Sequence, residues 1–259
     1  MKHIEAPIGV FDSGVGGISV LRELVALMPQ EDFIYIGDSI HAPYGTKPHD
    51  EVHQYVLATV EKLLKQNVKI IVIACNTATS VSIRALRPLY PQVHFVGIEP
   101  AIKPAAEKRP DSRVLVMATP MTLSEEKFQK NVARFQEKAD FIPVPCPGLM
   151  ELIEGGHLSD APAREYLTRL LTPYFTEPVG AIVLGCTHYP FIRGLVQEIA
   201  GSDVLIVDGS AGTARETRRQ LEAEGLLRTD NHRGTIILQN TAHSRHLLTL
   251  SQKLLTMKL

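Results

Sequence analysis

The segment IVIACNT, residues 71–77, decides the fold expected for this chain. Three apolar residues lead into a small residue, a cysteine and two polar residues, which is typical of a buried strand that ends before a helix. The segment IVLGCTH, residues 182–188, repeats this pattern in the second half of the sequence. The match predicts an internal duplication, with one α/β unit around Cys75 and another around Cys186.

Short apolar runs alternate with longer amphipathic stretches along the rest of the chain. The runs are rich in Ile, Val or Phe, as expected for parallel strands that are buried on both faces. The predicted strands are 8–11, 33–36, 69–74, 94–98, 113–117, 141–144, 181–184 and 204–207, and the clearest predicted helices are 19–28, 49–66, 123–137 and 213–224.

This alternation predicts an α/β fold made of two similar doubly wound domains with mainly parallel sheets. Proline and glycine punctuation follows Ile98 and recurs at 208–210. We therefore expect an N-terminal domain from 1–97 plus 210–259, with the C-terminal segment returning to it, and a second domain from 98–209. Most polar motifs follow strand ends, where open parallel sheets bind their ligands.

The composition excludes several classes of protein. The chain has 259 residues, of which 44% are hydrophobic and 21% charged, as in globular proteins with a large core. Its 27 basic and 28 acidic residues give no electrostatic support for nucleic-acid binding. No apolar run is long enough to span a membrane, and Asp12 interrupts the N-terminal one. Three cysteines fit free thiols in a reducing compartment, so we expect a cytoplasmic protein.

The segment GVFDSGVGG, residues 9–17, predicts a strand, a glycine-rich turn and a helix. It is an incomplete dinucleotide motif because Ser19 replaces the third glycine, and it lacks the Gly-Lys-Ser/Thr of a phosphate-binding loop. Two interpretations stay open. The turn is a tight connection capped by Asp12, or Asp12 accepts from an ammonium group while free N–H groups bind a carboxylate.

Three other segments have less specific patterns. In GDSIHAPYG, residues 37–45, Asp38 follows a strand in what is either a polar loop or part of a site. Glu151 and Glu154 share one face of a predicted helix that ends at Gly155, which fits a solvated face or a functional one. Cys146 lies between two prolines and has no match in the other half, so we expect a structural cysteine far from the other two.

Two cysteines at equivalent strand ends favour acid–base chemistry. A helix N-terminus lowers the pKa of a thiol from about 8.5, so one cysteine can remove a proton from a carbon acid while the other delivers one to the opposite face.

Three alternatives to this acid–base pair stay open. Cys75, Cys186 and His188 could bind zinc, although no Cys-x-x-Cys is present. Cys186 and His188 could form a hydrolase pair, which leaves Cys75 without a role. The chain could also bind a small anion without catalysis.

Six motifs in order between residues 9 and 190 together resemble the glutamate racemase family. Aspartate racemases share the two-cysteine plan but usually lack the Asp-Ser-Gly-Val-Gly-Gly turn and carry Glu in place of His188. The motifs are 9–17, Gly37-Asp38-Ser39, Pro43-Tyr44-Gly45, 74–79, Gly97-Ile98-Glu99-Pro100 and 184–190.

The resemblance implies a racemase that uses no cofactor or metal, with glutamate bound in the cleft between two α/β domains and D-glutamate supplied for peptidoglycan. It implies that Cys75 serves the D-enantiomer and Cys186 the L-enantiomer, with Asp12 near Cys75 and His188 near Cys186 as their helpers and Asp38 and Glu154 as supporting carboxylates. A homodimer is expected, with no nucleic-acid or membrane partner. The residues implied to bind substrate are Asp12, Ser13, Tyr44, Gly45, Asn76, Thr77, Thr119, Thr187 and His188.

The sequence differs from the family in two places. Ile40-His41 stands where Ala-Arg is common. The long N-terminal extension of members that are activated by a cell-wall precursor does not precede residue 9, so we expect no such activation.

Overall fold

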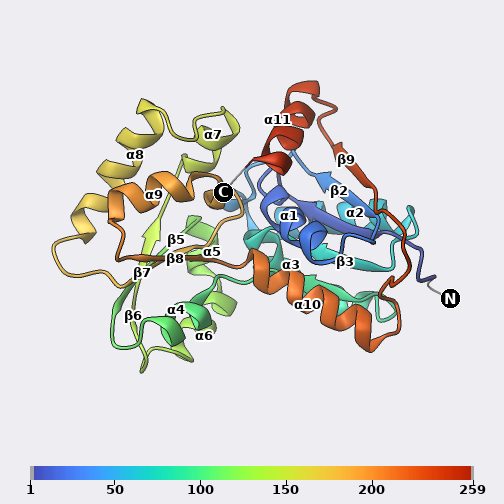
Figure 1. The fold of residues 1–259 in the computed structure, drawn as a ribbon, viewed down its shortest axis with the longest axis horizontal. Coiled ribbons are helices and arrows are strands. Elements are labelled where there is room, and N and C mark those ends of the chain that lie inside the picture. The colour runs from blue at the N-terminus through green and yellow to red at the C-terminus, as the bar shows by residue number, and fades with distance from the viewer. Residues whose placement is uncertain (1–2, 258–259) are drawn as a thin grey trace.

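The computed structural model of this protein describes residues 3–257 and has two lobes, each built around one parallel sheet (Figure 1). The first sheet has the strand order β4-β3-β1-β2-β9. Its central strand places Ile8 opposite Phe33 on one side and Ile70 on the other. The strands are β1 (Ile8–Asp12), β2 (Phe33–Gly37), β3 (Ile70–Ile73), β4 (Phe95–Gly97) and β9 (Ile236–Asn240).

The second sheet has the order β6-β5-β7-β8 and is also parallel. Its strands are β5 (Arg113–Ala118), β6 (Asp140–Pro145), β7 (Ala181–Leu184) and β8 (Leu205–Asp208). In this order β5 takes the place of β1, β6 that of β2, β7 that of β3 and β8 that of β4. The predicted similarity of the two halves is therefore confirmed in their strand order.

Helices cover both faces of each sheet, which confirms the doubly wound architecture. In β1 the alternation of side chains sends Val10 toward α1 and α10, and Phe11 toward α2 and α3. The helices are α1 (Ile18–Leu27), α2 (His49–Leu64), α3 (Asn76–Leu89), α4 (Ile102–Lys108), α5 (Pro120–Ser124), α6 (Glu126–Ala133), α7 (Leu149–Glu154), α8 (Ala161–Leu171), α9 (Arg193–Ala200), α10 (Ser210–Ala223) and α11 (Arg245–Thr256), with 3-10 turns η1 (Tyr44–Thr46), η2 (Thr172–Tyr174) and η3 (Tyr189–Ile192).

Two sequence-based expectations were wrong in detail. The helix expected over 123–137 is two helices, α5 and α6, because Glu125 has an extended backbone and the side-chain amide of Gln129 donates to the Leu123 carbonyl where α5 ends. Strand β9 was not expected at all. It is a partly buried edge strand with a short apolar run, Ile236-Ile237-Leu238, so it lacks the signal of a buried strand.

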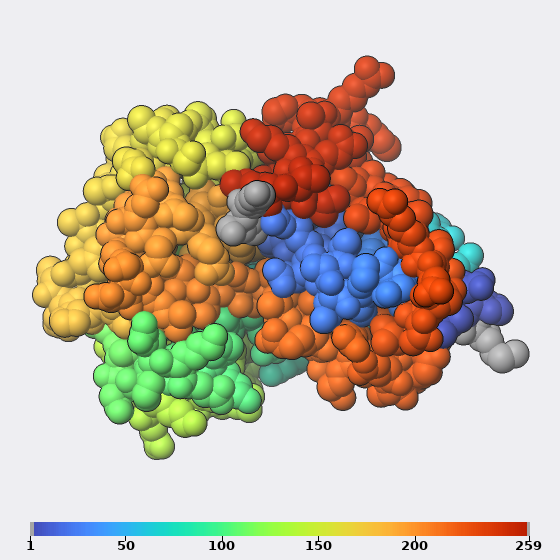
Figure 2. Space-filling model, in the orientation of Figure 1, coloured from blue at the N-terminus to red at the C-terminus, as the bar shows by residue number. Residues whose placement is uncertain are grey.

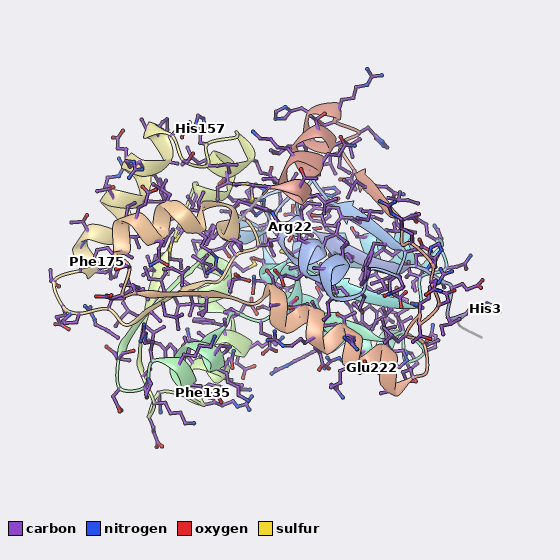
Figure 3. The ribbon with its side chains drawn as sticks, viewed as in Figure 1. His3, Arg22, Phe135, His157, Phe175 and Glu222 are labelled. Atoms are coloured by element: carbon purple, nitrogen blue, oxygen red, sulfur yellow. The ribbon has the colours of Figure 1, made fainter. Side chains whose placement is uncertain are left out.

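The chain after residue 210 lies on the first lobe. Strand β9 pairs with β2, and Arg22 of α1 donates a hydrogen bond to the Leu254 carbonyl of α11 at 3.0 Å (Figure 3). Figure 2 shows α1 in blue beside the orange and red C-terminal elements, with the green and yellow segments of the other lobe next to them. The predicted boundaries near 97 and 210 fall between strands of different sheets, and they stay a prediction. Within residues 3–257, no helix has the length and apolar character needed to cross a bilayer.

Candidate active site

A small cavity lies where the carboxyl ends of the two sheets meet. Cys75 follows β3 and Cys186 follows β7, and both line this cavity as free thiols. The equivalent strand ends of the two lobes therefore bring the two cysteines to one site. Ten of the residues proposed from the sequence line it: Ser13, Tyr44, Gly45, Cys75, Asn76, Thr77, Thr119, Cys186, Thr187 and His188.

Cys75 is the N-cap of α3, as the sequence predicted. Its sulfur accepts from the Ala78 N–H at 3.4 Å, and its thiol donates to Ser13 Oγ at 3.6 Å. The expected fall in its pKa was wrong. Burial raises the pKa of Cys75 to about 12, and the nearby Asp12 charge acts in the same direction, so the helix N-terminus does not compensate. Cys75 is therefore a protonated thiol near neutral pH.

Cys186 has a different partner. The sulfur lies 3.7 Å from His188 Nδ1, and His188 Nε2 lies 2.9 Å from a Glu154 carboxylate oxygen. No α-helix begins directly after Cys186, because the chain first forms the turn η3. The predicted proximity of His188 to Cys186 is confirmed, and Glu154 reaches the site through His188.

The pair of His188 and Glu154 is charged. Burial alone lowers the pKa of His188, but its hydrogen bonds with Cys186 and Glu154 outweigh burial and hold that pKa well above its usual range. Burial raises the pKa of Glu154, but the interactions with His188 outweigh this effect and hold it below its usual range. His188 is therefore an imidazolium that donates from both ring nitrogens, one of them to the Cys186 sulfur.

Two N–H groups of the glycine-rich turn after β1 are used within the protein. The Gly14 N–H donates to Asp12 Oδ1 at 2.9 Å, and the Val15 N–H donates to Glu154 Oε1 at 3.1 Å. One anion at this turn is thus the Glu154 carboxylate, and binding of a substrate carboxylate by other N–H groups of the turn stays a prediction. Small residues are required because a Cβ on Gly16 would lie 2.4 Å from His188 Nδ1, so the turn of one lobe packs directly on the site residues of the other.

Asp12 lies beneath the cavity and is absent from the described residues that line it. It accepts from Thr187 Oγ1 at 2.9 Å. Burial raises the pKa of Asp12, while the His188 charge lowers it. Its charge acts on Cys75, as expected, but the contact to that sulfur is made by Ser13.

Asp38 is likewise set back from the cavity. Its carboxylate accepts from Tyr44 Oη at 2.5 Å, so the Tyr44 hydroxyl is used within the protein and is not free to hold a substrate carboxylate. The ring of Tyr44 and the backbone of Gly45 form the wall. Asp38 contacts the cavity wall through Tyr44, and its expected role as a supporting carboxylate stays a prediction.

Comparison with known proteins agrees with this geometry. The family model for Asp/Glu/Hydantoin racemase matches residues 8–217, which include both cysteines. The chain belongs to this family. A glutamate racemase of Clostridium botulinum is 47% identical over 100% of both chains.

Solved structures of racemases in this family share the fold. A glutamate racemase isoform of Bacillus anthracis has a TM-score of 0.87 at 28% identity, covering 99% of this chain and 96% of that one. The Escherichia coli glutamate racemase, crystallised with L-glutamate and the activator UDP-MurNAc-ala, has a TM-score of 0.85 at 31% identity, covering 96% and 95%.

The racemase fold also corrects the interpretation of Cys146. It lines the same cavity as Cys75 and Cys186, and so it is not remote from them. It also has a match in the other lobe. The Cys146 N–H donates to Ala118 O at 3.1 Å after β6, as the Asp38 N–H donates to Asp12 O at 2.8 Å after β2. In each lobe, the residue that follows one strand is hydrogen-bonded to the end of the neighbouring strand. A comparison of short sequence motifs cannot detect this equivalence of Cys146 and Asp38.

Thr122 and Glu151 are among the lining residues that were not proposed as site residues. Thr122 closes a group of three hydroxyls, 3.2 Å from Thr77 and 2.9 Å from Thr119, that joins α3 of one lobe to α5 of the other. Glu151 of α7 lies in the lining, and Glu154 of the same helix contacts His188. The shared helical face was the only signal for Glu151. Among residues 3–257, no group of three or more His, Cys, Asp or Glu side chains is placed to hold a metal ion.

Proposed function

We propose that this racemase interconverts L- and D-glutamate by moving a proton at the α-carbon, with Cys75 and Cys186 as the two acid–base groups. One observation carries the proposal: two free cysteines from equivalent strand ends of the two lobes line a single cavity. Inversion at a carbon atom needs one group on each face. A hydrolase pair of Cys186 and His188 gives no role to Cys75.

The proton on Cys75 and the positive charge of His188 favour one direction of reaction, from L-glutamate to D-glutamate. Cys75 carries its proton because burial raises its pKa to about 12. The imidazolium of His188 is placed to stabilise a thiolate on Cys186. A site with Cys186 as base and Cys75 as acid accepts L-glutamate and releases D-glutamate.

The reaction is a balanced proton transfer. The Cys186 thiolate takes the α-proton of L-glutamate and becomes a thiol, and the bonding electrons stay on the substrate as a carbanion delocalised into its α-carboxylate. The Cys75 thiol then gives its proton to the opposite face and becomes a thiolate. The product is D-glutamate, and the reverse reaction begins from this second protonation state.

Neutral donors bind the substrate in this proposal. The described lining contains no Lys or Arg, and His188 is its one cation. The hydroxyl of Thr77 and the side-chain amide of Asn76 would donate to the carboxylates. The hydroxyls of Thr119 and Thr187 donate to Thr122 and Asp12, so their oxygens would accept from the ammonium group. Asn76 Oδ1 is buried and lacks a hydrogen-bond partner within the described chain, so a substrate ammonium group would satisfy it.

The size of the cavity makes opening of the cleft part of the proposal. Its volume is about 40 Å³, room for roughly three water molecules, and glutamate is larger than this. We therefore infer that the lobes separate for substrate entry. Closing around the substrate then excludes water and strengthens the polar contacts to the carbanion.

We also propose that the D-glutamate supplies peptidoglycan synthesis and that the enzyme is a cytoplasmic homodimer. The family membership supports the first part, and the three free cysteines support a reducing compartment. The dimer follows from the resemblance alone, and light scattering on the purified chain tests it.

Incubation with L-glutamate and no added cofactor, followed by chiral chromatography, tests the proposed function. We expect D-glutamate to accumulate until the two enantiomers are equal. L-Aspartate is the matched control because it lacks one methylene, and we expect little conversion of it. Failure to form D-glutamate, or activity that disappears after treatment with EDTA, would contradict the proposal.

A further inference from the structure

A cluster of polar and aromatic side chains lies directly behind the cavity wall, around the buried carboxylate of Asp38. Tyr44 Oη donates to this carboxylate at 2.5 Å, and Thr241 Oγ1 donates at 2.8 Å. His41 Nδ1 lies 2.9 and 3.1 Å from its two oxygens. Because a carboxylate only accepts hydrogen bonds, His41 is the third donor.

The His41 ring is held on its other side by α2. It stacks on Tyr55 with the ring centres 3.8 Å apart and the planes 13° from parallel. The Tyr55 hydroxyl donates to Glu51 at 2.5 Å, and Lys47 lies 3.6 Å from the same carboxylate. The His41 side chain is 35% exposed, so these contacts hold its position and burial does not.

The cluster reaches the cavity through Tyr44. Tyr44 and Gly45 line the wall, and a Cβ on Gly45 would lie 2.7 Å from Thr119 Cβ, so this wall closes tightly against the other lobe. Burial and the Asp38 charge raise the pKa of Tyr44 well above its usual range, so its hydroxyl stays a donor to Asp38. A shift of Asp38 therefore moves the wall.

We propose that His41 is a positioning residue of the racemase site: it fixes Asp38, and through Asp38 it sets the Tyr44–Gly45 wall against which the substrate binds. The inference rests on the proposed function and extends it to a residue outside the cavity. Because the wall contacts bound glutamate in the ground state and the transition state alike, His41 governs KM more than kcat.

Two elements hold the His41 side chain in place. Asp38 contacts it from the end of β2, and Tyr55 stacks on it from α2, with Glu51 and Lys47 beside Tyr55. The donor to Asp38 is thus fixed on a well-ordered ring, and its loss leaves Asp38 with one donor fewer behind the cavity wall.

Three variants test the inference by steady-state kinetics with L-glutamate. His41→Phe keeps the stacking on Tyr55 but removes the donor to Asp38. His41→Arg keeps a donor to Asp38. His157→Phe is the matched control, because His157 pairs with Asp160 at 2.7 Å on the exposed surface of the other lobe.

We expect His41→Phe to raise KM about tenfold, the equivalent of one lost charge-assisted hydrogen bond, and to leave kcat within about twofold. His41→Arg, which keeps the donor, should hold KM within about threefold of the unaltered enzyme. His157→Phe should match the unaltered enzyme. If His41→Phe does not fold, His41→Ala, which also lacks the donor, decides.

An unchanged KM in the folded variant without the donor, a loss confined to kcat, or a KM in His41→Arg raised as far as in His41→Phe would overturn the inference alone. Absence of any racemisation by the unaltered chain would overturn the proposed function, and this inference with it.

Discussion

At the scale of single residues, the two cysteines differ in the groups that surround their sulfur atoms. Cys75 is buried against Ser13 and Asp12, and Cys186 lies beside the His188 imidazolium. Serine keeps the shape of cysteine but is too weak an acid for either role. We expect Cys75→Ser and Cys186→Ser each to lower kcat/KM about 10³-fold, and the double variant to lose little more, because the two thiols act as a unit.

Cys146→Ser is the control for these variants because Cys146 lines the same cavity. Its thiol donates to the Val144 carbonyl at 3.2 Å, and a serine hydroxyl can do the same. We expect activity within about threefold of the unaltered enzyme. A Cys75→Ser variant with normal activity beside an inactive Cys186→Ser variant would favour the hydrolase pair.

The pair of His188 and Glu154 makes stability depend on pH. The pKa of Glu154 is lowered from 4.5, so its contribution is complete above that value and is lost as the pH falls through the folded pKa. The pKa of His188 is raised from 6.5, so its contribution is complete below that value and is lost as the pH rises through the folded pKa. Together they stabilise most between these two values.

Urea unfolding of Glu154→Gln checks this window. We expect the variant to lose about 2 kcal/mol of unfolding free energy near pH 5.5, less than a fully buried pair costs, because His188 can release its proton. The difference should shrink at alkaline pH. A difference that stays constant or grows as the pH rises would show that the pair is not charged in the folded protein.

At the scale of elements, the turn between β1 and α1 shows why glycine is needed at the junction of the lobes. A Cβ on Gly16 would lie 2.4 Å from His188 Nδ1 and 2.5 Å from Thr187 Oγ1. Gly16→Ala must displace His188 from Cys186, so we expect kcat to fall at least about tenfold, the price of misplacing one proton-transfer partner.

Gly194→Ala is the matched control in the kinetic assay. A Cβ there meets nothing within 4 Å, and Gly194 lies in α9. Alanine should leave kcat unchanged and stabilise the fold by up to about 1 kcal/mol. Equal activity of the two glycine variants would show that the close packing of the turn on His188 has no role in turnover.

A second element-scale feature ties the start of β3 to the connection before β9. Lys69 is fully buried and lies 2.5 Å from Glu31, and its ammonium also donates to the carbonyls of Ile4 and Leu226. Lys69→Met leaves the Glu31 charge without its partner, so we expect a loss of roughly 3–5 kcal/mol in urea unfolding. Adding Glu31→Gln should recover much of that loss, and a double variant that is less stable still would contradict this account.

At the scale of the whole molecule, local patterns predicted most of the fold. Eight strands were placed within two residues of their observed bounds because each contains a short apolar run followed by a turn, and all but the edge strand β6 are largely buried. Strand β9 and the break at Glu125 were missed because their causes are non-local: β9 depends on pairing with β2, and the break depends on the Gln129 side chain.

The site was predictable as a set of residues but not as a set of contacts. The cysteines and His188 were found from motifs at strand ends, and the resemblance added Thr77, Thr119 and Thr187. The placement of Asp12 and Asp38 behind the cavity, and of Cys146 within it, depends on how the two sheets face each other. Burial raises the pKa of Cys75, opposite to the expected shift. The sequence does not reveal how deeply the N-terminus of α3 is buried from solvent.

Racemisation of L-glutamate in deuterated water tests the central claim, that two thiols act from opposite faces of one α-carbon. Cys75 exchanges its proton with the solvent between turnovers and delivers deuterium, while Cys186 holds the proton that it has removed. Mass spectrometry of the separated enantiomers at early times should therefore find deuterium in the newly formed D-glutamate and almost none in the recovered L-glutamate. Equal labelling of the two enantiomers would mean that a single base exchanges with both, which contradicts the two-thiol account.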